Sequence, residues 1–193
     1  MADRQVSILE AAVRVIARDG VRGLRVEKLA AEAGVSTALI YYHFKDRAGL
    51  VGRTLQFVSD RAGSYTDADA VATPDDPRRE LEQRLLLELQ DSDEVRENSI
   101  AWGELRASAV FDAALREDLG EATTVWCREI ADLVRAAQAA GTARHDADPD
   151  AVAERLTALV EGLSERWHSG SLERGRARAL LQGAIDAELG PGR

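Results

Sequence analysis

The sequence predicts an all-α protein in which a small N-terminal helix-turn-helix domain precedes a larger helical bundle. Apolar residues recur at helical spacing along most of the 193 residues. No pair of alternating strand patterns and no hairpin dipeptide between apolar runs is found. Near the N-terminus, Gly34-Val35-Ser36 separates two short helical patterns, as the turn of a helix-turn-helix does.

Four helices are expected in the first third of the chain. The first covers about residues 4–19 and stops at Gly20, which tolerates the positive φ of a helix end. Two short helices follow at about 26–33 and 37–44, and the Ser36 hydroxyl can cap the second. A fourth begins at Asp46 or Arg47 and extends to about residue 63.

Five more helices are expected after a loop. Residues 64–77 contain Pro74, Pro77 and four aspartates, which favours a loop. The pairs Asp76-Pro77 and Asp148-Pro149 are start signals in which a cap precedes a first-turn proline. The expected helices cover about 77–90, 94–108, 112–140, 149–168 and 172–189, which makes about nine in total.

The charge distribution separates the two ends of the chain. The net charge is −9, but residues 1–63 carry +3 and residues 64–193 carry −12. A basic head on an acidic body lets one end approach phosphate while the other end repels DNA. We expect a DNA-binding domain at residues 1–48 and a regulatory and dimerisation domain at 49–193.

Several other classes of protein lack support in the sequence. Cys127 is the single cysteine, so no internal disulfide can form, and no apolar run has the roughly 18–20 residues of a membrane span. A cytoplasmic protein without membrane partners is expected. No nucleophile or phosphate-loop motif is present, and Glu165 with His168 is one isolated Glu-x-x-His pair. We therefore expect no enzyme activity, no cofactor and no metal.

Residues 25–50 carry the functional signal. The turn must be tight so that the second short helix protrudes, and Ala30, Ala31 and Ala33 let the two helices pack closely. The second helix exposes side chains that fit a major groove about 12 Å wide. Each charged or aromatic residue alone would be ordinary surface or packing, and only the joint spacing predicts DNA binding.

The block Gly34-Val35-Ser36-Thr37-Ala38-Leu39-Ile40-Tyr41-Tyr42-His43-Phe44-Lys45-Asp46-Arg47 resembles the tetracycline-repressor-type (TetR-type) regulators. Leu29-Ala30 before it and Leu50 after it extend the likeness, which covers about residues 8–50. The resemblance implies a bacterial repressor that a small molecule releases from a palindromic operator. It also implies a ligand site between the central helices and a homodimer formed by the last two helices.

The resemblance assigns DNA contacts by position. Base edges or phosphate are implied near the start of the recognition helix, and phosphates near its end and at the next helix. The implied residues are Arg25, Ser36, Thr37, Ala38, Tyr41, Tyr42, His43, Lys45 and Arg47. The chain departs from the family at the cap of the second helix, where Arg25-Val26 stands in place of the usual threonine. This removes an oxygen cap worth about 1 kcal/mol.

The regulatory body offers weaker ligand-site candidates, because core packing is at least as good an explanation for each of them. Arg106, an arginine among apolar neighbours, could hold an anionic ligand group, pair with Glu104 or lie exposed. The ligand-site candidates are Phe57, Trp102, Leu105, Arg106, Phe111, Trp126 and Ile130. Broad apolar stripes on the last two helices suggest a two-fold interface. Its candidates are Leu156, Leu159, Val160, Leu163, Trp167, Leu180, Leu181, Ala184 and Ile185.

Two alternatives stay open at this point. One is a helical enzyme or carrier that uses the helix-turn-helix for another interaction, and a gel shift on promoter DNA separates it. The other is an activator, or a regulator that no small molecule controls, and a reporter assay with candidate inducers distinguishes it.

Overall fold

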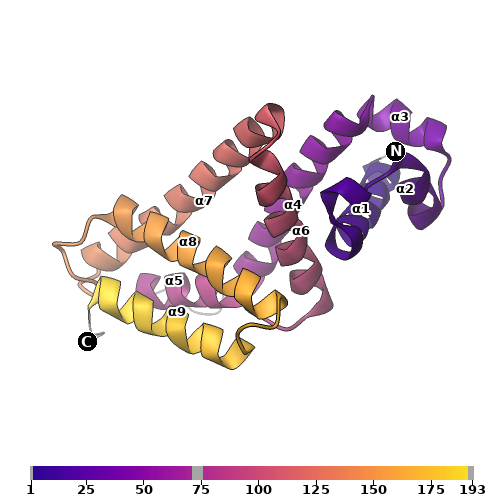
Figure 1. Ribbon diagram of the computed structural model, residues 1–193. Helices are drawn as coiled ribbons and strands as arrows, with labels where there is room; N and C mark the ends of the chain where they lie inside the picture. Colours follow the sequence, from indigo (N-terminus) through magenta and orange to yellow (C-terminus); the bar gives the residue numbers. More distant parts are fainter. Residues whose placement is uncertain (1, 71–75, 191–193) are drawn as a thin grey trace. The chain divides into compact units, whose positions relative to one another are not determined.

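The computed structural model describes residues 2–70 and 76–190, which form nine α-helices and no strand (Figure 1). The helices are α1 (Ala2–Gly23), α2 (Val26–Ala33), α3 (Thr37–Phe44), α4 (Arg47–Ala70), α5 (Pro77–Leu87), α6 (Asp93–Ala109), α7 (Ala113–Ala139), α8 (Pro149–His168) and α9 (Arg174–Leu189). None of the helices in these residues has the length and apolar character needed to cross a bilayer.

The chain divides into two compact units. The first comprises residues up to 61 together with 96–122, and the second comprises 62–95 together with the residues from 123 onward. The domain border that we predicted after residue 48 falls inside α4. The reason is that the first half of α4 has an apolar face, which belongs to the core of the first unit. We also predicted that residues 1–48 bind DNA and that residues 49–193 regulate binding and dimerise. This assignment of functions stays a prediction.

The core of the first unit joins α1 to the helix-turn-helix and to parts of α4, α6 and α7. Ile16 of α1 and Leu29 of α2 are fully buried, and Leu50 of α4 and Leu105 of α6 lie in the same cluster. Each such side chain contributes about 1.5–3 kcal/mol by leaving water. The helices α1, α2 and α3 thus share one core with parts of α4, α6 and α7.

The second unit packs α5, α8 and α9 with the later part of α7. Its core includes Leu85, Val134, Leu163 and Ile185, all buried. Helix α9 contacts both α8 and α5. Arg78, only 7% exposed, donates to the carbonyl oxygens of Thr142 and Gly190 and to the Asp186 carboxylate, so it ties α5 to the C-terminal end of the fold.

Most predicted helix positions are confirmed, but several ends differ. Helix α1 runs to Gly23 instead of about residue 19, and α5 ends at Leu87 instead of about residue 90. Helix α4 continues to Ala70 instead of ending near residue 63, and the Thr66 hydroxyl donates back to the Ala62 carbonyl within it. Residues 71–75 of the predicted loop lie outside the described residues. Helix α9 begins at Arg174, because the amide of Leu172 donates to the Arg166 carbonyl at the end of α8.

Candidate nucleic-acid interface

The turn between α2 and α3 has the tight geometry that the sequence predicts. Gly34 takes φ 64° and ψ 37°, a left-handed conformation that glycine adopts without steric cost. The Val35 amide donates to the Ala30 carbonyl at 2.9 Å, which closes the end of α2. Ser36 then caps α3, because its Oγ accepts from the Leu39 amide at 3.3 Å. The two eight-residue helices are therefore joined by only three residues.

Helix α3 has one face in the core and one in solvent. Ile40 and Phe44 are buried, as we expected. Tyr41 is 49% exposed and Tyr42 is 73% exposed. Ser36, Thr37 and Ala38 at the start of the helix are exposed as well, and His43 is half-buried with its ring nearly perpendicular to that of Tyr42. This arrangement presents polar and aromatic side chains along one side of a short, anchored helix, as entry into a major groove requires.

Ion pairs neutralise two acidic groups of the head. The Glu32 carboxylate of α2 accepts from Arg14 and Arg18 of α1, and these bonds lower its pKa. Asp19 pairs with Lys28, and this contact, with Arg18, lowers the Asp19 pKa. Both carboxylates therefore stay charged and paired at neutral pH, which reduces their repulsion of DNA phosphates.

Arg25 and Arg47 differ in how they are used. Arg25 precedes α2 and is exposed, and its side chain makes no capping hydrogen bond to that helix. The guanidinium of Arg47 donates from Nε to the Leu24 carbonyl at 3.1 Å and from Nη2 to the Val21 carbonyl at 2.5 Å. Arg47 thus holds the corner between α1 and α2, because carbonyls at the end of a helix lack partners within it. A phosphate contact was the expected role of Arg47, and it remains a prediction.

The connection between α3 and α4 contains a strained residue. Lys45 has φ 64° and ψ −58°, and the Asp46 amide donates to the Phe44 carbonyl at 2.7 Å, which makes a γ-turn. A β-carbon at position 49 would collide with the same Phe44 carbonyl, so the turn requires Gly49. Lys45 is exposed at this turn. Strain of this kind persists where the surrounding structure determines the conformation.

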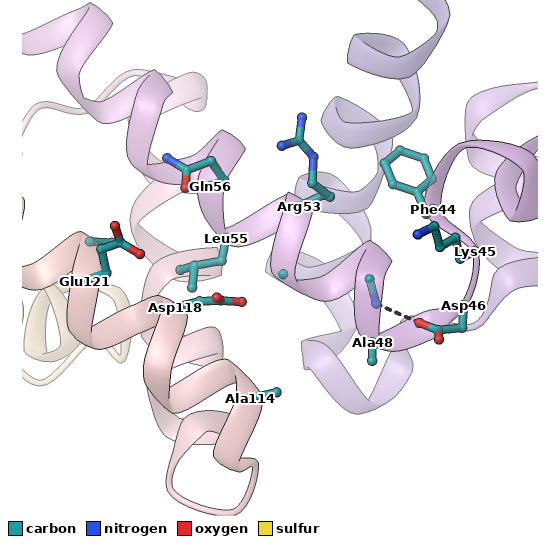
Figure 2. Close-up of a pocket in the computed structure, with 13 residues that line it drawn as sticks. Phe44, Lys45, Asp46, Ala48, Arg53, Leu55, Gln56, Ala114, Asp118 and Glu121 are labelled. Atoms are coloured by element: carbon teal, nitrogen blue, oxygen red, sulfur yellow. Dashed lines mark hydrogen bonds between the residues drawn. The ribbon is translucent and has the colours of Figure 1, made fainter.

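A groove of about 550 Å³ lies beside this turn, between the first turns of α4 and the start of α7. Figure 2 shows Asp118 and Glu121 on the α7 side and Arg53 and Gln56 on the α4 side. The Asp46 carboxylate at its rim accepts from the Gly49 amide at 2.8 Å and so caps α4. Charges of both signs line this surface, and the sequence pattern did not predict it.

The predicted ligand residues are divided between the two units. Leu105 is buried in the core of the first unit, and Phe57 and Trp102 pack partly against that core. The Arg106 guanidinium lies 5.4 Å from the centre of the Trp102 ring, and Phe111 is 83% exposed. In the second unit, Ile130 is buried and Trp126 packs against the core. Leu105 and Ile130 thus serve as core, and the Phe111 side chain projects into solvent.

The predicted dimer residues fall into a buried group and an exposed group, and their role in a dimer stays a prediction. Five of them are buried inside the second unit because α8 and α9 use them to close their own core. These five are Leu156, Val160, Leu163, Leu181 and Ile185. Leu180 is exposed, and Leu159, Trp167 and Ala184 are partly exposed. A stripe of apolar residues at helical spacing cannot distinguish these two uses.

The sequence pattern did not predict one pair of polar residues in the second unit. The Tyr65 hydroxyl of α4 donates to the Glu88 carboxylate at 2.8 Å, just after α5. Burial raises the Glu88 pKa to about 7, although the Tyr65 bond opposes that shift. Glu88 makes no ion pair within the described residues. A carboxylate without a cation is costly away from water, so this group is a candidate for ligand binding.

Comparison of the sequence with family profiles gives two matches. Residues 8–54 match the profile of "Bacterial regulatory proteins, tetR family". Residues 77–190 match "BetI-type transcriptional repressor, C-terminal". The "HTH-type transcriptional regulator BetI" of Burkholderia ambifaria is 25% identical over 189 residues, which cover 95% of this chain and 91% of that protein.

Two solved structures with the same fold have a higher sequence identity to this chain than the Burkholderia ambifaria protein has. A crystal structure from Rhodococcus sp., described as TetR-family, has 47% identity and a TM-score of 0.90, covering 98% of this chain and 100% of that one. A regulator from Saccharomonospora viridis, solved in complex with choline, has 28% identity and a TM-score of 0.85. It matches over 98% of both chains.

Proposed function

Because the chain belongs to the TetR family of bacterial transcriptional regulators, we propose that it is a dimeric repressor that a small organic cation releases from a palindromic operator. As a member of that family it is a DNA-binding regulator and not an enzyme. The operator, the surface that forms the dimer and the cation are the parts that we propose. We also propose a cytoplasmic location, because bacterial operator DNA lies there.

The observation that carries the proposal is the exposed face of α3. Tyr42 is 73% exposed, although a tyrosine gains by burying its ring. Ile40 and Phe44 anchor the helix from the opposite side, so the exposed face has a fixed orientation. We assign Thr37 and Ala38 to base edges and Tyr41, Tyr42, His43 and Lys45 to the DNA backbone. Arg25 and the capped start of α3 at Ser36 are further phosphate contacts.

Selection of bound fragments from a random DNA pool tests this assignment. The protein should enrich a palindrome whose half-sites are about one helical turn or more apart, because two heads must enter major grooves on one side of the duplex. Thr37→Ala should change the enriched bases, whereas Tyr42→Ala should weaken binding to all sequences. Glu117→Ala on α7, an exposed residue of the first unit, is the control for altered surface. Enrichment of no sequence would reject the proposed operator binding.

The proposed effector class rests on Glu88. Its carboxyl group is desolvated, and within the described residues it has Tyr65 as its polar partner and no cation. A bound organic cation would supply the missing positive charge, and the Tyr65 ring offers an aromatic face for it. The regulator solved with choline, at 28% identity, supports a ligand of this class.

Choline and tetramethylammonium are suitable probes for the effector. Each should raise the melting temperature and weaken operator binding, because a ligand shifts the equilibrium only if it prefers the state that does not bind DNA. Glu88→Gln should abolish both effects, whereas Glu154→Gln on the exposed side of α8 should abolish neither. If neither cation changes the melting temperature or operator affinity, the effector class is wrong and the DNA-binding assignment stands.

The proposed dimer uses the outer face of α8 and α9. Small residues are exposed there beside Leu180, and added β-carbons at Gly162 and Gly183 would meet no atom within 4 Å. Small side chains let helices of two chains approach closely. Leu159, Leu180 and Ala184 are then the apolar contacts, and the two chains form a four-helix, two-fold interface.

A further inference from the structure

An acidic residue of α6 bonds to the corner between α1 and α2, which comprises residues 20–24. The Val21 amide donates to Oε2 of Glu104 at 3.3 Å, across 83 residues of sequence. The same oxygen lies 2.8 Å from the place where a β-carbon would stand on Gly20. Gly20 has φ 72° and ψ 168°, which interrupts the helical geometry of α1. Glycine at position 20 therefore permits both the bend and the approach of Glu104.

A second residue holds the same corner from α4. Arg47 donates to the carbonyl oxygens of Val21 and Leu24, so the peptide groups of Val21 are bonded on both sides. Helix α2 starts at Val26, two residues after Leu24, and no side chain caps it. Glu104 and Arg47 therefore hold the chain just before α2, in addition to the buried side chains of α2 itself.

The apolar contacts around the corner belong to the same group of helices. Val21 and Leu24 are buried in the core that includes Ala101 and Leu105 of α6. Ala101 and Leu105 lie three residues before and one residue after Glu104, so this turn of α6 makes both apolar and polar contact with other parts of the first unit. A change in α6 at this turn must therefore act on the Gly20–Leu24 corner.

We propose that Glu104 is a positioning residue for DNA binding, which sets the placement of α2 and α3 by holding the Val21 amide. It touches no DNA itself. Because α2 packs against α3, a displaced corner moves the exposed face of the recognition helix. Through the Glu104 carboxylate, a movement of α6 would reach the recognition helix, as a movement of α4 would through Arg47.

The proposal also deepens the regulation of the operator site, and in this respect it rests on the proposed function. Trp102 and Arg106 flank Glu104 on α6, and both were candidates for ligand contact from the sequence. A rotation of α6 that accompanies effector binding would draw the carboxylate away from Val21. Operator affinity would then fall without any change in the residues that contact DNA.

Three variants test the positioning role by operator binding and by hydrogen exchange of the backbone amides. Glu104→Ala should weaken binding to the selected operator by about fivefold, the loss expected for one hydrogen bond. It should also speed exchange at the Val21 amide. Glu104→Gln keeps an acceptor oxygen and should restore both properties. Glu117→Ala removes an exposed acidic side chain of the same unit and should change neither.

The outcomes separate this proposal from its premise. If Glu104→Ala binds the operator like the wild type and its Val21 amide stays protected, the proposal is overturned. It is also overturned if Glu104→Gln behaves like Glu104→Ala, because the hydrogen bond is then irrelevant. If the wild type enriches no DNA, the proposed operator binding fails, whereas hydrogen exchange at Val21 still reports whether Glu104 holds the corner.

Discussion

Arg47 and Val21 are joined directly, with Nη2 of the guanidinium 2.5 Å from the Val21 carbonyl oxygen. The arginine stands at the first position of α4, whereas the carbonyl belongs to the last turn of α1. The sequence resemblance places a phosphate contact at this arginine. In the structure its donors toward Val21 and Leu24 are engaged within the protein.

Replacing Arg47 should therefore affect folding as well as DNA binding. Arg47→Ala should lower the free energy of unfolding by about 1–3 kcal/mol, because two carbonyl groups lose a charged donor. Arg47→Lys should not restore it, since an ammonium cannot span the Val21 and Leu24 carbonyls in the same fixed geometry. Chemical denaturation measures both variants. Wild-type stability with weakened operator binding would mean that Arg47 contacts phosphate and that its internal bonds contribute nothing.

Lys45 should show the opposite behaviour. Its side chain is exposed at the γ-turn and makes no salt bridge within the described residues. Lys45→Gln should leave stability nearly unchanged and reduce the dependence of log affinity on log salt by about one unit per bound head. Fluorescence anisotropy at several salt concentrations measures this slope. An unchanged slope would remove Lys45 from the set of phosphate contacts.

Glu88 should make the stability of the free protein depend on pH. Its pKa is about 7 in the folded protein against an ordinary value of 4.5, so the folded state holds the proton more tightly than the unfolded state. Stability should therefore fall as pH rises from about 4.5 to about 7. Glu88→Gln carries no such charge, so it should be more stable than the wild type at pH 8, by at most about 3 kcal/mol. The two proteins should be nearly equal at pH 4.5.

Thermal denaturation across this pH range provides the measurement, with Glu154→Gln as the control on α8. If the difference between wild type and Glu88→Gln is the same at pH 4.5 and pH 8, the carboxyl group does not titrate as the structure predicts. Glu88 would then lose its role as the charge that attracts an organic cation.

Leu180 allows a direct test of the proposed dimer. The side chain is 37% exposed on α9, and the buried residues beside it close the core of the second unit. Leu180→Asp should convert the dimer to a folded monomer, because a charge at the centre of an apolar interface loses its water. Light scattering after gel filtration gives the mass, and circular dichroism checks that helices remain. A dimeric Leu180→Asp protein would place the interface elsewhere.

The helix-turn-helix was predictable from sequence because local signals determine it. Gly34 accounts for the turn, Ser36 for the cap, and the spacing of Ile40 and Phe44 for the buried side of α3. The missing cap before α2 was also visible from the sequence, at Arg25.

The remaining features depend on contacts between distant parts of the chain. No local pattern indicates that Glu104 bonds to Val21 or that Tyr65 bonds to Glu88. Apolar periodicity likewise predicted that Leu163 and Leu181 face away from solvent, but it could not say whether their partner is the same chain or a second one. Both residues lie in the core of their own chain.

The most direct test of the central claim is the affinity of wild type and Tyr42→Ala for the selected operator, measured by anisotropy beside a scrambled duplex. We predict that the wild type prefers the operator by about a thousandfold or more and that Tyr42→Ala binds it at least tenfold more weakly with unchanged melting temperature. Equal affinity of the wild type for both duplexes, or unimpaired binding by Tyr42→Ala, would contradict the assignment of α3 to the major groove.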